Sequence, residues 1–175
     1  MARCAVLTAL LSICAWIGFP LGDVSVTLQT FGLFLTLGLL GGKHGTLVCL
    51  LYLLLGAVGL PVFSGFRGGL GTLFGATGGY ILGFLAAALT YWMITGLLGQ
   101  RLPVRVMASM LGLAVCYSFG TLWYALVWTN GSGLSLSLIL GKCVLPYLLP
   151  DLIKLSLALA ATGKLKRIIL PSPGT

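Results

Sequence analysis

Residues 59–80 read GLPVFSGFRGGLGTLFGATGGY, with eight glycines and four aromatic residues between two apolar runs. Each glycine destabilises a helix by about 1 kcal/mol relative to alanine, so this composition argues against a membrane helix here. The segment is also too apolar for an ordinary solvated linker. Because non-helical backbone at membrane depth is tolerated only where it is buried in protein or lines a cavity, we interpret the segment as the wall of a small-ligand site. A tight helix crossing, which also uses glycine, is the alternative interpretation.

The chain as a whole has the composition of an integral membrane protein. Of its 175 residues, 59% are hydrophobic and 7% are charged, and the mean hydropathy is +1.13. No water-soluble domain of this length has such a composition. The formal net charge of +8 would suggest nucleic-acid binding in a soluble protein. In a membrane protein the membrane potential and the lipid headgroups explain it, so we expect lipid and not nucleic acid as a partner.

The apolar runs predict an all-α integral membrane protein with six transmembrane helices in a single domain, residues 1–175. A membrane crossing requires roughly 20 residues, and the breaks between the runs contain glycine, proline and charged residues. The predicted spans are residues 4–20, 24–41, 45–60, 77–98, 105–128 and 144–163.

The distribution of cations predicts the orientation of these six spans. Seven cations fall at the termini and the even-numbered connections, and two fall in the odd-numbered connections. The first group is Arg3, Lys43, Arg101, Arg105, Lys164, Lys166 and Arg167, and the second is Arg67 and Lys142. The positive-inside rule then predicts that both termini face the cytoplasm and that the glycine-rich segment faces outward.

An acid and a base lie inside the last predicted span. Asp151 and Lys154 are three residues apart, so they share one face of a helix. Each charge within a bilayer costs several kcal/mol, and such residues normally face a cavity or each other. Pro150 is compatible with two helix starts. A helix that begins at Pro150 has Asp151 in its first turn. A helix that begins near Val144 is kinked at Pro150, and one backbone carbonyl is left without its hydrogen bond. Both arrangements predict a polar pocket, and the alternative is an ion pair that only locks helix packing.

Three stretches together resemble the BioY family, the biotin-binding S subunits of energy-coupling-factor (ECF) transporters. They are GLPVFSGFRGGLGTLFGATGGYILGF at 59–84, Thr27-Leu28-Gln29-Thr30, and Pro150-Asp151-Leu152-Ile153-Lys154. The resemblance spans nearly the whole chain. It implies the six-helix S-component fold and biotin uptake across the cytoplasmic membrane, with biotin held near the outer face by the connection between helices 3 and 4 and by the Asp-x-x-Lys pair. It also implies a separate transmembrane coupling subunit and two ATPase subunits, contacted through small residues of the first helix, for which Ala5 and Ala9 are the candidates.

The chemistry of biotin agrees with these residues. Its ureido ring has two N–H donors and a carbonyl acceptor, so Asp151 can accept from the ring and Lys154 can donate to it. Its apolar ring and its carboxylate require other partners. The candidates for the apolar ring are Phe63, Phe66, Phe74 and Tyr80, those for the carboxylate are Arg67 and the amides of Gly68 and Gly69, and Gln29 is a further candidate.

Other functions have less support in the sequence. The spans offer no histidine and no carboxylate beyond Asp151, so we expect neither an enzyme nor a cofactor. The single histidine, His44, and five scattered cysteines argue against a metal site. An S subunit for another vitamin, such as riboflavin or thiamine, is the main alternative.

Overall fold

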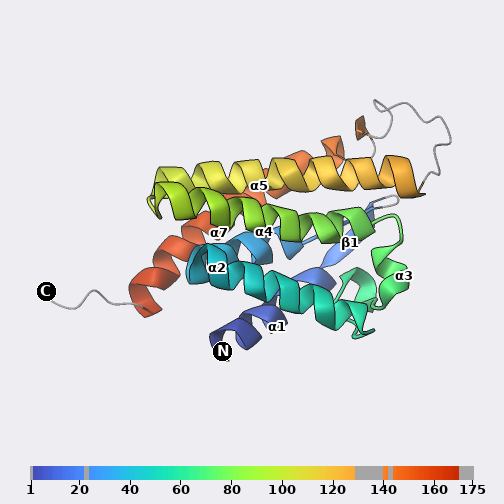
Figure 1. Cartoon of the computed structure of the whole chain (residues 1–175), viewed down its shortest axis with the longest axis horizontal. Helices are drawn as coiled ribbons and strands as arrows, with labels where there is room; N and C mark the ends of the chain where they lie inside the picture. Colours follow the sequence, from blue (N-terminus) through green and yellow to red (C-terminus); the bar gives the residue numbers. More distant parts are fainter. Residues whose placement is uncertain (1, 22–23, 129–139, 142–143, 170–175) are drawn as a thin grey trace, which may run out of the picture.

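The computed structural model describes residues 2–21, 24–128, 140–141 and 144–169, and helices dominate it (Figure 1). The long helices are α1 (Ala2–Trp16), α2 (Gln29–Ala57), α4 (Gly78–Leu98), α5 (Leu102–Trp123) and α7 (Leu145–Ile169). The short elements are strands β1 (Gly18–Leu21) and β2 (Val24–Thr27), the 3-10 turn η1 (Ser64–Phe66), the helix α3 (Leu70–Leu73) and the π-helical turn η2 (Tyr124–Trp128). Within the described residues, four helical stretches are long and apolar enough to cross a membrane, namely 29–57, 78–98, 102–127 and 145–166.

Helix α2 consists of two antiparallel segments that meet at Gly41. This residue has a φ of 79°, a conformation that glycine adopts without the steric cost of a side chain. The side-chain amide of Gln29 donates a hydrogen bond to the Tyr52 hydroxyl at 2.6 Å, although a straight helix would separate the two residues by about 35 Å. The two segments correspond to the second and third predicted spans. With α1, α4, α5 and α7 they confirm the six predicted helices.

A β-hairpin replaces the predicted helix at residues 18–20 and 24–27. β1 and β2 pair antiparallel, with Gly18 opposite Thr27. The predicted end of the first span at residue 20 and the predicted start of the second at residue 24 are therefore wrong. Gly18 allows this pairing, because a Cβ at that position would overlap the backbone of Val26. Thr27 and Val26 are β-branched, a type that favours strands.

The helices pack through small residues at their crossings. Gly83 of α4 lies against Cys116 of α5, and Gly112 of α5 lies against the carbonyl of Ala87 in α4. The two helices are therefore antiparallel, and Gly38 of α2 packs against Thr162 of α7 in the same way. Figure 1 shows the hairpin and α3 at one end of the bundle, here called the hairpin end, and the α4–α5 connection with the end of α7 at the opposite end.

The glycine-rich segment is largely a compact connection between α2 and α4 that contains only the short elements η1 and α3, in agreement with the prediction that it does not form a membrane helix. Its backbone bonds to α2 and to itself, since the Gly69 amide donates to the Gly56 carbonyl at 2.6 Å and the Phe63 amide to the Arg67 carbonyl at 2.9 Å. The Trp16 indole at the end of α1 donates to the Pro61 carbonyl at 2.8 Å. The connection is thereby held over the hairpin end of the bundle.

Candidate functional site

A cavity of about 330 Å³ lies at the hairpin end, between the hairpin, the glycine-rich segment and helices α2, α4, α5 and α7. This volume is within the usual range for a small-molecule site. Its lining is Trp16, Gly18, Phe19, Ser25, Val26, Thr27, Gln29, Thr30, Phe63, Ser64, Gly65, Arg67, Thr72, Thr77, Tyr80, Ile81, Phe84, Leu113, Cys116, Tyr117, Tyr147, Asp151 and Lys154.

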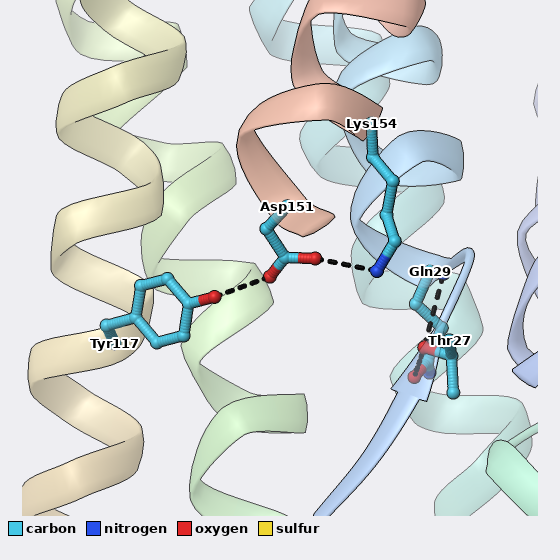
Figure 2. A network of polar contacts seen from close by, with 5 residues as sticks. All are labelled: Thr27, Gln29, Tyr117, Asp151 and Lys154. Atoms are coloured by element: carbon cyan, nitrogen blue, oxygen red, sulfur yellow. Dashed lines mark hydrogen bonds and ion pairs between the residues drawn. The ribbon is translucent and has the colours of Figure 1, made fainter. Parts of the chain in front are cut away.

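The acid and the base of α7 meet in this cavity and are joined by a tyrosine of α5 (Figure 2). Lys154 Nζ lies 2.8 Å from Asp151 Oδ1, and the Tyr117 hydroxyl donates to Asp151 Oδ2 at 2.6 Å. Asp151 and Lys154 are only 8% and 9% exposed. Helix α7 begins at Leu145 and contains Pro150, which confirms the predicted helix start near Val144. Pro150 has no N–H to donate to the carbonyl of Pro146.

These contacts leave hydrogen-bonding capacity at the cavity surface. A carboxylate has about four acceptor positions and an ammonium has three donors, and the described contacts use two of the former and one of the latter. Asp151 can therefore accept further hydrogen bonds while Lys154 donates to a neighbouring atom. The pair suits a planar ligand group that carries N–H donors next to a carbonyl.

A second polar pair, Thr27 at the end of β2 and Gln29 at the start of α2, lines the same cavity as Lys154. The Thr27 hydroxyl donates to Gln29 Oε1 at 2.9 Å, and Gln29 Nε2 donates to Tyr52. Figure 2 shows the Lys154 side chain extending toward this pair. Gln29 is 6% exposed, and its orientation is determined by Thr27 on one side and Tyr52 on the other. Its carbonyl oxygen keeps one acceptor position for a ligand.

Aromatic side chains form the apolar wall of the cavity. Phe63 is completely buried and packs edge-on against Tyr52, with ring centroids 5.4 Å apart. Tyr80 packs edge-on against Tyr117 at 6.4 Å. The cavity therefore has a charged pair on α7 and aromatic faces supplied by α4, α5 and the glycine-rich segment. Arg67 is exposed and lies at the margin.

The structure brings six of the predicted ligand-binding residues to the cavity: Gln29, Phe63, Arg67, Tyr80, Asp151 and Lys154. Four other candidates do not line it. Phe66 stacks on Trp16 at 4.9 Å, and Phe74 lies 6.1 Å from the Trp123 ring. Gly69 uses its amide to bind the Gly56 carbonyl. Gly68 packs directly against the carbonyl of Leu60.

Sequence reasoning missed Tyr117, Tyr147 and Thr27 as site residues. Tyr117 lies in the middle of an apolar helix, and the signal that could have identified it is chemical: a buried tyrosine hydroxyl usually has a hydrogen-bond partner. Asp151 is the only acid that the described residues contain, so it was the natural partner. The described residues include no group of three metal-ligating side chains.

A cavity that contains a buried ion pair, within a bundle of apolar helices, defines a multi-pass membrane protein with a small-molecule site. The fold belongs to the S-component class. The crystal structure of the S-component for biotin from an ECF-type ABC transporter matches with a TM-score of 0.83 and 26% sequence identity, over 95% of this chain and 89% of the other.

The sequence comparisons then identify the family. A model described as the BioY family matches residues 1–170. A probable biotin transporter BioY of Pyrococcus horikoshii is 40% identical over 162 residues, 93% of each chain. The biotin transporter BioY of Thermotoga maritima is 42% identical over 123 residues, covering 69% of this chain and 70% of its own. The chain belongs to the BioY family. Both relatives are named as transporters. This agrees with the expectation that the present protein is not an enzyme and requires no cofactor.

Proposed function

We propose that this protein binds biotin and acts as the substrate-specific S subunit in its uptake across the cytoplasmic membrane. The buried Asp151–Lys154 pair carries this proposal, because it places an acceptor and a donor side by side in an otherwise largely aromatic and apolar cavity. The ureido ring of biotin has the complementary arrangement of N–H groups and carbonyl. The names of the relatives support the same ligand.

The remaining cavity residues suit the other parts of biotin. Phe63 and Tyr80 offer aromatic faces to the apolar ring, and Arg67 at the margin can pair with the carboxylate of the valerate chain. The polar pair of Thr27 and Gln29 lines the same cavity, and the Lys154 side chain extends toward it (Figure 2), so we assign this pair to the ureido end as well. Phe66, Gly68 and Gly69 are proposed to act indirectly, by holding the segment that carries Phe63 and Arg67.

Equilibrium displacement tests the ligand assignment. Labelled biotin bound to the purified, detergent-solubilised protein should be displaced by unlabelled biotin and not by similar concentrations of riboflavin or thiamine. A ligand that does not satisfy the buried pair leaves polar groups unpaired, which produces strong discrimination. Preferential displacement by riboflavin or thiamine would assign the protein to another vitamin.

The proposed orientation has both termini in the cytoplasm and the cavity at the outer side of the membrane. The cations support it, because Lys164 and Lys166 lie near the end of α7, Arg101 and Arg105 lie at the α4–α5 connection, and both places are at the end of the bundle opposite the hairpin. Reporter fusions should place the α4–α5 connection in the cytoplasm and the glycine-rich segment outside. A reporter at Gly71 that remains cytoplasmic would reverse the orientation.

The proposed contact with the coupling subunit is the face of α1 that carries Ala5 and Ala9. Both alanines are exposed, and with Leu51 and Leu55 of α2 they line an almost entirely apolar hollow of about 500 Å³. Small residues permit close approach of a partner helix. Leucine at Ala5 and Ala9 should therefore abolish copurification with the coupling subunit and two ATPases while biotin binding by the isolated subunit is retained. Unchanged copurification would exclude this face.

A further inference from the structure

Residues 61–67 of the glycine-rich segment form a small loop, here called the Phe63 loop, whose two ends lie together. Gly68 packs directly against the carbonyl of Leu60, which closes the neck of the loop. Gly59 and Gly69 flank the neck with φ of 109° and 86°, and a Cβ at either position would meet no atom within 4 Å. A few such residues at the ends of a loop are enough to absorb the change in backbone angles when the loop moves.

The Phe63 loop is one wall of the cavity, and Trp16 is its hydrogen-bonded tie to the rest of the described structure. Four residues of the loop line the cavity, namely Phe63, Ser64, Gly65 and Arg67. Among the described residues, the only hydrogen bond between the loop and another helix or strand is donated by the Trp16 indole to the Pro61 carbonyl, at 2.8 Å. The position of this wall therefore depends on the end of α1.

Trp16 contacts the loop through its ring as well. The ring stacks on Phe66 at a centroid distance of 4.9 Å, and Phe66 is 64% exposed. The next residue of the chain bonds the opposite side of the cavity, since the Ile17 carbonyl accepts from the Leu28 amide, between the hairpin and α2, at 2.9 Å. The end of α1 thus holds two walls of the cavity together.

The second anchor of the loop is the Phe63 ring, which is completely buried and packed against Tyr52. Releasing this ring would expose a large apolar surface and is therefore costly. Trp16 is 38% exposed, and its release breaks only one neutral hydrogen bond and one stacked pair. Opening the outer part of the loop at Trp16 therefore requires less free energy than lifting Phe63 out of the core.

We propose that Trp16 is a positioning residue that holds the Phe63 loop closed and thereby sets the rates at which the ligand enters and leaves the cavity. Its hydrogen bond and its stack involve only protein atoms, so they stabilise the closed loop whether or not a ligand is present. Contacts of equal strength in the free and the occupied protein do not change the affinity. Loss of Trp16 should therefore accelerate binding and release together and leave the dissociation constant nearly unchanged.

Modification of Cys116, followed by peptide mass spectrometry, measures entry into the cavity without any vitamin. Among the described cysteines, Cys116 is the one that lines the cavity, so a small thiol reagent has to enter the cavity to reach it. Methyl methanethiosulfonate should modify Cys116 about fivefold faster in Trp16→Phe, which keeps a ring but has no indole N–H, and about thirtyfold faster in Trp16→Ala. Cys49 is the internal reference, because it is completely buried outside the cavity, and its rate should not change.

Trp92→Ala is the matched control variant. Trp92 is 41% exposed, close to the 38% of Trp16, but it lies beside Gly42 at the opposite end of the bundle. Its loss should leave the Cys116 rate as in the wild type. Phe66→Ala removes the partner of the stack and should accelerate the Cys116 reaction about fivefold, with no further acceleration when it is combined with Trp16→Ala.

The rates for biotin rest on the proposed function and are measured separately. Rapid filtration with radiolabelled biotin should give association and dissociation rates raised by the same factors as the Cys116 rate, and a dissociation constant within about twofold of the wild type. If the wild type binds no biotin, the proposed function fails, while the Cys116 rates still decide the role of Trp16.

An unchanged Cys116 rate in both Trp16 variants would overturn the inference. Equal acceleration at Cys49 would also overturn it, because it indicates a general loosening of the bundle. So would faster release of biotin with an unchanged association rate, which indicates that Trp16 contacts the ligand directly.

Discussion

Asp151→Asn and Lys154→Ala should each weaken biotin binding roughly thirtyfold or more. Asparagine keeps the shape of aspartate but replaces one acceptor oxygen by a donor, and alanine removes the ammonium from the cavity. Loss of a hydrogen bond to a charged group costs on the order of 2 kcal/mol, which corresponds to this change in affinity. Equilibrium binding of labelled biotin to the purified variants measures it.

Thermal unfolding of the same samples separates ligand binding from structural support. Removing one member of a buried pair strands the other, which can destabilise a protein by several kcal/mol. Tyr117→Phe is the control, because it removes only the hydrogen bond to Asp151 Oδ2 and leaves both charges paired. We expect a smaller loss of affinity, and a loss of stability of about 2 kcal/mol for the missing hydrogen bond, below that of the variants that strand a charge. Collapse of stability in Asp151→Asn and Lys154→Ala, with affinity preserved in the folded fraction, would make the pair a packing device.

Gly56→Ala should lower the stability of the protein by on the order of 3 kcal/mol and weaken ligand binding. A Cβ on Gly56 would overlap the ring of Phe63, and that ring is completely buried and packed against Tyr52. Overpacking of this kind forces side chains and backbone to shift. The shift would move the aromatic wall of the cavity, and through Tyr52 it would disturb Gln29. The midpoint of thermal unfolding and the biotin dissociation constant measure both effects.

Gly96→Ala is the matched control for this substitution. Gly96 lies in α4, and a Cβ there meets no atom within 4 Å. Alanine is favoured over glycine in a helix by about 1 kcal/mol, so this variant should be equally or more stable and should bind biotin normally. Equal stability of Gly56→Ala and the wild type would show that the loop carrying Phe63 adjusts freely.

The amino-acid sequence by itself determined that the protein lies in a membrane, that it is helical and that Asp151 and Lys154 form a charged pair. Apolar runs of sufficient length have few stable alternatives to helix in a bilayer, because every backbone polar group must be bonded internally. The spacing of Asp151 and Lys154 places both on one helix face whatever surrounds them. The glycines of residues 59–80 likewise predicted that this segment forms no membrane helix, since their cost to a helix is local.

Only the tertiary structure decided which other side chains join that pair. Tyr117 is 34 residues before Asp151, and it reaches the carboxylate because the fold brings this face of α5 within hydrogen-bonding distance of α7. Phe63 and Phe66 are three residues apart in the same loop, yet Phe63 lines the cavity and Phe66 stacks on Trp16. Their directions follow from local backbone angles, with φ of 70° at Gly65 and 57° at Phe66. A helix has a period from which side-chain directions can be predicted, whereas an irregular loop has none, and its directions are set by the surfaces against which it packs.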